Sequence, residues 1–361
     1  MNKTLDILIS PTIRCSLCCK YCYVNQTLPA NESDMTLNDF HRAFSWVREL
    51  GDLCGIERFR FTWFGGEPLL KGPDFLRRAL ALQKEIFVDQ KCVFNVMQTN
   101  LTFCDEEVVR LIKESFRGCV GVSDDYDAPW RTFPNGADSR LIVEKNIMRL
   151  KENNISVGVV CTLTKSHLGR ARELYQHFKK LGVDFRVNRA AGTSSIESYY
   201  ITVEQYNEFV KKLFDIYLSD PNPTIEVLNF TVMSRLYLGG LPFFCIDGLE
   251  EYKYIGIEAN GRIMSRCRYA GQLGNYNFDT PLSFLEKCRR IQKGRTSPQR
   301  CLKCEFLGKV CLGGCRGESD VDCFNSDCGY RTETTYDLWL YVSKYLSSRG
   351  HYFGEFAGSV K

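Results

Sequence analysis

The segment "RCSLCCKYCY", residues 14–23, places four cysteines within eight positions near the beginning of the chain. It follows the apolar stretch "LDILIS" (5–10), which is typical of a buried strand. The cysteine spacing allows two interpretations. Cys19 and Cys22 form a C-x2-C pair that, together with a distant second pair, is typical of a zinc ribbon. Cys15, Cys19 and Cys22 instead offer three thiolates, which suit a [4Fe–4S] cluster whose fourth iron is open to a small molecule.

The composition favours metal binding over a disulfide framework. The chain has 361 residues with 18 cysteines, only 4 histidines and a net charge of +4, and its length allows one to three domains. We find neither a signal peptide nor a run of about 18 apolar residues, so we expect a cytoplasmic protein with reduced thiols and no membrane contact. The small, dispersed charge argues against nucleic-acid binding. The scarce histidines argue against a His-rich zinc or non-haem iron site.

Apolar strand-like segments alternate with amphipathic helix-like segments along the first two thirds of the chain. The predicted strands are 5–10, 59–64, 92–98, 119–123, 155–163 and 183–188, and the predicted helices are 36–50, 73–89, 105–115, 139–153, 167–181 and 203–218. This alternation predicts a parallel sheet with helices outside, either an open sheet or a partial barrel. Ligands of such folds bind at the carboxyl ends of the strands, where the cysteine loop is expected.

The cysteine loop carries a family resemblance. "TIRCSLCCKYCY" (12–23) resembles the signature of radical S-adenosylmethionine (SAM) enzymes, in which the open iron binds the amino and carboxylate groups of SAM. The resemblance implies that Cys15, Cys19 and Cys22 are the cluster ligands and that Cys18 occupies a variable position. Tyr21, just before the last ligand, is expected to shield the cluster.

The second strand ends in "WFGGEP" (63–68). Gly-Gly-Glu-Pro alone is typical of a turn, but its glycines let backbone carbonyls approach a ligand closely, and the glutamate can accept hydrogen bonds. In radical SAM enzymes the corresponding motif holds the methionine ammonium. The resemblance therefore assigns Gly65, Gly66, Glu67 and Pro68 to SAM binding.

The third and fourth strands end in "QTN" and "SDDYD". By the same resemblance, Ser123 and Arg131 address the SAM carboxylate, with Arg140 as the alternative arginine. Gln98 and Asn100 are expected to line the substrate cavity.

Paired cysteines replace the β–α alternation after about residue 240. Their C-x2-C spacing also fits zinc sites. The pattern resembles the SPASM extension of radical SAM enzymes, which houses two auxiliary [4Fe–4S] clusters. Two intervals are one residue longer than in the family, and no cysteine follows closely after the first. The resemblance implies one cluster on Cys245, Cys267 and Cys315, with Cys323 as a candidate fourth ligand, and another on Cys301, Cys304, Cys311 and Cys328.

Together these features predict an α/β chain with a partial (β/α)6 TIM-like barrel, a small cysteine-rich SPASM domain and a C-terminal helix. The expected cofactors are SAM and three [4Fe–4S] clusters. The expected boundaries are 1–190 for the partial barrel, 191–240 for a helical bridging segment, 241–335 for the SPASM domain, and 336–361 for the last helix and tail.

The layout resembles anaerobic sulfatase-maturating enzymes, which oxidise a cysteine or serine side chain to formylglycine. Those enzymes place an aspartate base after the cysteine that corresponds to Cys267, where this chain has Arg268. We therefore expect, ahead of formylglycine formation, a maturase that abstracts hydrogen from a ribosomally made peptide to install a carbon–carbon or thioether cross-link or a similar oxidation. The candidate bases are Asp124, Asp125, Asp247 and Glu318.

The expected partners are a peptide or protein substrate and an electron donor such as flavodoxin or ferredoxin. Because there is no room for a leader-binding domain before Cys15, we expect leader recognition from a separate protein or from the aromatic segment around 195–240. A non-catalytic iron–sulfur or zinc protein is the alternative of another class, and radical chemistry on a small metabolite is a third. The motif "WFGGEP" favours an enzyme, because a scaffold has no need of a SAM-binding turn.

Overall fold

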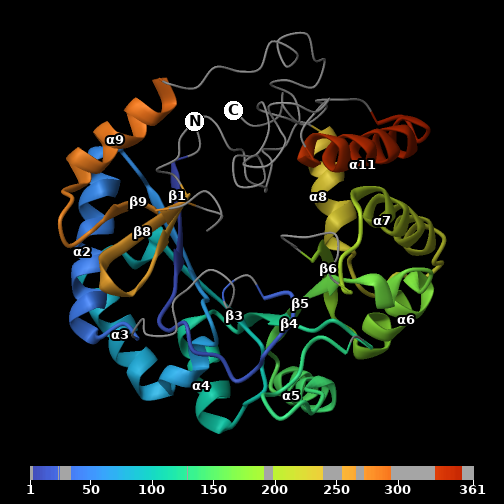
Figure 1. The fold of residues 1–361 in the computed structure, drawn as a ribbon, viewed down its shortest axis with the longest axis horizontal. Helices are drawn as coiled ribbons and strands as arrows, with labels where there is room; N and C mark the ends of the chain where they lie inside the picture. The colour runs from blue at the N-terminus through green and yellow to red at the C-terminus, as the bar shows by residue number, and fades with distance from the viewer. Residues whose placement is uncertain are drawn as a thin grey trace. The chain divides into compact units, whose positions relative to one another are not determined.

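The computed structural model describes residues 3–22, 24, 34–127, 129–190, 198–238, 254–265, 272–293 and 330–351. The chain divides into two compact units (Figure 1). The first contains residues 1–123, 131–158 and 250–295, and the second contains 124–130, 159–249 and 296–361.

The first unit is built on a sheet whose parallel strands follow the chain order. The strands are β1 (Thr4–Ile9), β2 (Arg58–Trp63), β3 (Val93–Thr99) and β4 (Cys119–Ser123), each paired with the next. Because parallel strands point the same way, their carboxyl ends share one edge of the sheet. The cysteine loop, the Gly-Gly turn and the "QTN" segment therefore meet at that edge.

A second stretch of chain extends this sheet on the other side of β1. There β7 (Tyr254–Ile257) pairs in parallel with β1, and β8 (Arg262–Ser265) and β9 (Gln272–Asn275) continue the sheet in antiparallel order. β7 thus belongs to the same sheet as β1, the strand from which the cysteine loop leaves.

Helices pack on the outside of this sheet. In the first unit they are α2 (Leu37–Leu53), α3 (Pro73–Ile86), α4 (Glu106–Ser115), α5 (Arg140–Glu152) and α9 (Pro281–Lys293). Figure 1 shows α2, α3 and α4 along one face of the strands. α2 begins with a capping box, in which Thr36 accepts from the Asp39 backbone N–H and Asp39 accepts from that of Thr36.

An aromatic core joins α2 to β2. The rings of Phe40 and Trp63 stack with centroids 5.4 Å apart, and those of Phe44 and Phe61 meet edge to face at 5.5 Å. All four side chains are fully buried. Such pairs add about 0.5–1.5 kcal/mol each beyond the area they bury, so this core fixes the strand that ends in the Gly-Gly turn.

The second unit contains β5 (Ser156–Leu163), from residue 159 onward, and its neighbour β6 (Asp184–Arg189). Its helices are α6 (Ala171–Leu181), α7 (Val203–Leu218), α8 (Leu228–Tyr237) and α11 (Tyr330–Ser347). α11 packs on α7 and α8. One contact joins the Phe230 and Tyr345 rings, whose centroids are 5.6 Å apart.

One predicted helix begins later than expected. The sequence predicts a helix over 167–181, but α6 starts at Ala171. Thr164 and His167 instead close a separate 3-10 turn, in which the Thr164 backbone N–H donates to His167 Nδ1 at 3.0 Å. Gly169 then adopts a φ of +82°, which ends that turn before α6 begins.

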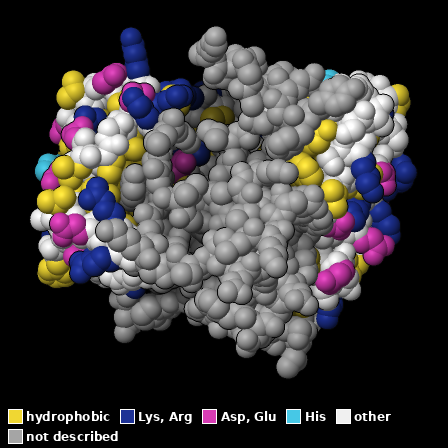
Figure 2. Space-filling model, turned by 90° about the horizontal axis from the view of Figure 1, so that it is seen from above, with side chains coloured by type: hydrophobic (Ala, Val, Ile, Leu, Met, Phe, Trp, Pro, Cys, Tyr) yellow, Lys and Arg dark blue, Asp and Glu magenta, His cyan; other side chains and the backbone are white. Residues whose placement is uncertain are grey.

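The surface of the described residues carries mixed charge. Lysine and arginine side chains are interspersed with aspartate and glutamate on the part that Figure 2 colours. Among the helices of the described ranges, none has both the length and the apolar character needed to span a membrane.

Candidate functional site

The cysteine loop leaves the carboxyl end of β1. Cys15, Cys19 and Cys22 are half-buried, and none of the three is in a disulfide. A backbone hydrogen bond of 3.1 Å from Cys22 N to Cys19 O closes the second half of the loop into a turn. Cys18 is exposed. Tyr21 is half-buried on the same loop.

The Gly-Gly turn after β2 lies directly against the backbone of the cysteine loop. Gly66 N donates to Thr12 O at 2.9 Å, and Glu67 N donates to Arg14 O at 2.8 Å. A Cβ atom on Gly66 would lie 2.1 Å from Arg14 O, and one on Gly65, whose φ is +134°, would lie 2.5 Å from Thr12 O. In the structure these glycines therefore allow the turn to approach the chain that carries the cysteines.

The Glu67 carboxylate connects the ends of two strands. It is buried, and it accepts from Leu69 N at 2.9 Å, Thr99 Oγ1 at 2.8 Å and Asn100 N at 2.6 Å. Burial raises the pKa of Glu67 above its usual value, and these donors act in the opposite direction. Pro68, also buried, opens the 3-10 helix Pro68–Lys71 that completes the turn.

The side chain of Asn100 faces the cysteine loop. Its Nδ2 lies 3.4 Å from Cys15 Sγ and 3.0 Å from Ser16 Oγ, and its Oδ1 accepts from the Thr102 backbone N–H at 3.1 Å. Every polar atom of this amide thus has a partner in the first unit. The contact with substrate predicted for Asn100 stays a prediction.

Gln98 and Ser123 meet across the ends of β3 and β4, where Gln98 Nε2 donates to Ser123 Oγ at 2.9 Å. Arg131 is buried, and its positive charge lowers the pKa of Glu67 in opposition to burial. Arg140, the alternative arginine, lies on α5 with its guanidinium 3.8 Å from the Glu144 carboxylate. Of the two arginines, Arg131 is the one whose charge reaches the carboxylate of the Gly-Gly-Glu-Pro turn.

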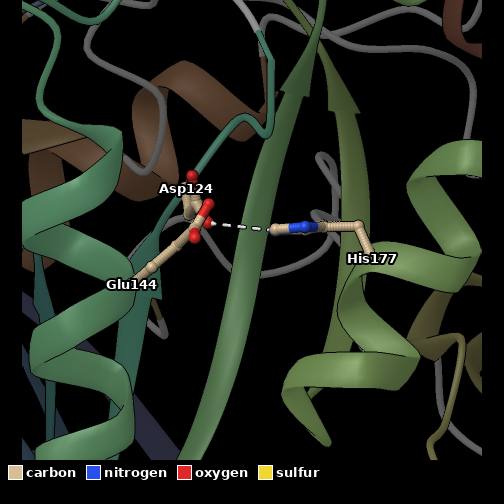
Figure 3. A group of neighbouring side chains, drawn as sticks. All are labelled: Asp124, Glu144 and His177. Atoms are coloured by element: carbon tan, nitrogen blue, oxygen red, sulfur yellow. Dashed lines mark ion pairs between the residues drawn. The ribbon is translucent and has the colours of Figure 1, made fainter.

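Two of the four candidate bases, Asp124 and Asp125, are among the described residues, and both belong to the second unit. Asp124 and Asp125 are both buried. Asp124 Oδ2 and His177 Nε2 are 4.0 Å apart and point toward each other (Figure 3). Asp125 Oδ1 accepts from Thr162 N at 2.8 Å. Asp125 Oδ1 thus has a hydrogen-bond donor within this unit, whereas Asp124 Oδ2 is buried without one.

Several predicted site residues lie outside the described residues. They are Asp247, Glu318, Arg268 and the eight cysteines Cys245, Cys267, Cys301, Cys304, Cys311, Cys315, Cys323 and Cys328.

Residues 9–165 match the family model of the Radical SAM superfamily. The chain carries a radical SAM domain. The match begins at the last residue of β1 and extends past β5, so it contains the cysteine loop, the Gly-Gly turn and the ends of β3 and β4.

Relatives extend this likeness along most of the chain. The cysteine-type anaerobic sulfatase-maturating enzyme of Clostridium perfringens (strain 13 / Type A) is 24% identical over 334 residues, which cover 86% of this chain and 89% of that protein. The serine-type anaerobic sulfatase-maturating enzyme of Klebsiella aerogenes is 23% identical over 334 residues, covering 87% and 80%.

Solved structures show the same fold. Native anSMEcpe with bound AdoMet has a TM-score of 0.78 at 22% identity and covers 96% of this chain and 98% of its own. Streptococcus suis SuiB bound to precursor peptide SuiA has a TM-score of 0.61 at 19% identity, covering 88% and 73%. The predicted fold class, an α/β chain with a partial barrel, is confirmed. Most of the predicted SPASM domain lies outside the described residues.

The residues of the cysteine loop fit an iron–sulfur cluster in this radical SAM domain. Three thiols lie on one short loop, none is oxidised to a disulfide, and Cys15 Sγ accepts N–H groups from Asn100 and Leu17. Cysteine thiolates are the ligands of [4Fe–4S] clusters, and hydrogen bonds to their sulfurs change the reduction potential of such clusters.

Two residues that hold the site have no signal in the sequence. Thr99 Oγ1 donates to Glu67, and Asn146 Nδ2 on α5 donates to Leu101 O at 2.9 Å. Threonine in a strand and asparagine in a helix are ordinary, and only the fold brings them to these partners.

Proposed function

We propose that this chain is a radical SAM maturase that oxidises a side chain of a peptide or protein substrate. The observation that carries the proposal is the meeting of the cysteine loop, the Gly-Gly turn and the "QTN" segment at one edge of the sheet in a radical SAM domain. Likeness to two kinds of sulfatase maturase over 86% and 87% of the chain supports a peptide or protein as the substrate.

Cys15, Cys19 and Cys22 would hold a [4Fe–4S] cluster, and SAM would bind its open iron. When bound and reduced, this pair supplies a 5′-deoxyadenosyl radical, which removes a hydrogen atom from the substrate. Tyr21 and the turn from Gly65 to Pro68 form the protein surround of the site. The Glu67 carboxylate keeps that turn in register with β3, because it binds backbone and side-chain donors at the end of β3.

Ser123 and Arg131 would address the carboxylate of SAM. A buried arginine can form a charge-assisted hydrogen bond with a carboxylate, which is stronger than a neutral one. Gln98, which donates to Ser123, would orient that hydroxyl.

The segment 241–335 would form an auxiliary-cluster domain after the partial barrel of 1–190 and the bridging segment of 191–240, with the last helix and tail at 336–361. Its two [4Fe–4S] clusters would use the cysteines named above. We expect flavodoxin or ferredoxin to deliver the electron that reduces the SAM-binding cluster.

Oxidation of a cysteine or serine to formylglycine is the first candidate reaction. The sequence favours a cross-link because Arg268 replaces the expected aspartate, but the comparisons give more support to the sulfatase-maturase alternative. If formylglycine is the product, a group other than residue 268 has to accept the proton that the substrate side chain loses. The four candidate bases are Asp124, Asp125, Asp247 and Glu318. Of the two that the structure describes, Asp125 accepts a hydrogen bond from Thr162 N, whereas Asp124 Oδ2 is buried without a hydrogen-bond donor.

A carbon–carbon or thioether cross-link is the second candidate. Arg268 favours it, because a guanidinium stays protonated in proteins and cannot serve as a base. Such an enzyme would need a way to hold its substrate, either through a separate leader-peptide-binding protein or through its own surface.

The decisive experiment incubates the anaerobically reconstituted chain with SAM, dithionite and sulfatase-type peptides that carry cysteine or serine. Formylglycine formation replaces the thiol sulfur of cysteine by oxygen and gives an aldehyde that a hydrazide reagent captures. A cross-link removes two hydrogen atoms and leaves no aldehyde. If the iron-loaded, reduced protein releases no 5′-deoxyadenosine from SAM, the chain is a non-catalytic cluster protein and the proposal fails.

A pair of variants tests the cluster itself. Cys19→Ser should lower the iron content by about four per chain, because a [4Fe–4S] cluster loses one of its three thiolates. Cys18→Ser, the matched control one residue away, should keep the iron content of the wild type. If both variants bind the same amount of iron, Cys19 is not a ligand and the proposed ligand set is wrong.

A further inference from the structure

Cys15 receives two N–H donors from the first unit. Asn100 Nδ2 lies 3.4 Å from its sulfur, and Leu17 N lies 3.5 Å from it. The Leu17 donor comes from the cysteine loop itself. The Asn100 donor comes from the end of β3, 85 residues away in sequence, so it is present only in the folded unit.

The orientation of the Asn100 amide is fixed by its other contacts. Its Oδ1 accepts from Thr102 N at 3.1 Å and from Thr102 Oγ1 at 3.0 Å, and its Nδ2 also donates to Ser16 Oγ at 3.0 Å. Turning the amide over would place its NH₂ group against the Thr102 N–H and its oxygen against the sulfur. The nitrogen therefore faces Cys15.

The backbone around Asn100 is held as firmly as its side chain. Asn100 N donates to the buried Glu67 carboxylate at 2.6 Å. The next residue, Leu101, is fully buried and has a φ of +52°, a conformation that a leucine rarely adopts. Thr99 Oγ1 accepts from Leu101 N at 2.9 Å, and Asn146 donates to Leu101 O. An unfavourable backbone conformation persists only where such contacts impose it.

We propose that Asn100 is a positioning residue that raises the reduction potential of the SAM-binding cluster through its hydrogen bond to Cys15. Reduction adds an electron to a cluster whose thiolate ligands are already negative. An N–H group directed at one of these sulfurs stabilises the more negative, reduced state, so hydrogen bonds to sulfur raise the potential. The inference rests on the proposed [4Fe–4S] cluster and gives Asn100 a role in electron uptake by it.

The test is a redox titration of the reconstituted full chain without SAM, followed by electron paramagnetic resonance of the reduced clusters. The SAM-binding cluster is identified as the one whose signal changes when SAM is added to a parallel sample. In Asn100→Leu we expect about a tenfold fall in the ratio of reduced to oxidised cluster at a fixed potential. For one electron this is a shift of about 59 mV to more negative potential.

A second variant protects the test against a folding defect. Asn100→Asp keeps the size of the side chain and an oxygen for Thr102, but it places a negative charge beside the sulfur. The ratio of reduced to oxidised cluster should therefore fall further than in Asn100→Leu. Asn95→Leu is the matched control: it removes an amide from β3, the strand that ends just before Asn100. This amide contacts Trp63 and Gln83 and not a cysteine, so the potential should stay that of the wild type.

An unchanged potential in either iron-loaded Asn100 variant would overturn the inference. So would an equal shift in the Asn95 control, because the loss of an amide alone would then explain the change. Neither outcome would contradict the proposed function. That proposal fails if the wild-type chain assembles no SAM-responsive cluster or releases no 5′-deoxyadenosine from SAM.

Discussion

Replacement of Gly66 with alanine should displace the loop that carries the cysteines. The added Cβ would lie 2.1 Å from Arg14 O and 2.4 Å from Ile13 O. Because ordinary contact begins at 3.4 Å, the Arg14 carbonyl would have to move by about 1.3 Å. These atoms belong to the backbone, so no side-chain rotation relieves the overlap. Arg14 adjoins Cys15, and the displacement therefore reaches the first of the proposed cluster ligands.

Two contributions set the magnitude of this effect. Overpacking of a close-packed site lowers the free energy of unfolding by about 1–3 kcal/mol. The backbone hydrogen bonds from Gly66 to Thr12 and from Glu67 to Arg14 contribute about 1 kcal/mol each. A loop that moves away gives up these bonds while it relieves the overlap, so the contributions do not add fully. We expect a total loss of about 2–4 kcal/mol.

The assay is a urea titration followed by circular dichroism, together with the iron content after anaerobic reconstitution. Gly158→Ala is the matched control, because no heavy atom lies within 4 Å of the added Cβ. It should change the free energy of unfolding by less than about 0.5 kcal/mol. The reasoning is refuted if Gly66→Ala unfolds at the urea concentration of the wild type and keeps its full iron content.

Three further changes test the packing of each unit. Asn146→Leu leaves the buried Leu101 carbonyl without its donor and should lower the free energy of unfolding by about 1–3 kcal/mol in a urea titration. Trp46→Phe keeps a ring but removes the Nε1 donor to a backbone carbonyl, with a loss of about 1 kcal/mol in the same assay. The pKa of Asp220 is lowered from 3.8 to about 2, and the hydrogen bond from Lys179 is the largest cause. Because the folded pKa lies below the unfolded one, this pair stabilises the protein above pH 3.8, and that stability is lost as the pH falls to about 2. Asp220→Asn should therefore reduce the change in the thermal unfolding midpoint between pH 3.8 and about pH 2. A midpoint that depends on pH as steeply as in the wild type would contradict this role of the pair.

Local signals in the sequence were enough to predict most of the elements. Thr36 followed by Asp39 at the third helical position determines where α2 begins, since the capping box uses only neighbouring residues. Alternation of strands and helices predicts a parallel sheet, and that alone places the cysteine loop and the Gly-Gly turn at the same edge. Gly169 shows the limit of such signals, because a single glycine delays α6 within a continuous helical pattern.

Which residues far apart in the chain contact each other depends on strand register, and the sequence contains no local signal for that register. The pairing of β7 with β1 joins residues that are almost 250 positions apart, from Asp6 with Tyr254 to Ile9 with Ile257. A shift of one residue would turn each side chain to the other face of the sheet, and only the packing of the whole unit selects one alignment.

The sequence by itself determined the groups on which the proposed chemistry depends: three thiols at C-x3-C-x2-C and a Gly-Gly-Glu-Pro turn one strand later. The tertiary structure decided what surrounds them. It presses Gly66 against the Arg14 carbonyl, buries the Glu67 carboxylate under the end of β3, and brings the Asn100 amide to the Cys15 sulfur. Hydrogen-bond geometry requires atoms to lie within a few tenths of an ångström of their partners, and distances of that kind are set by the packed core and not by residue type.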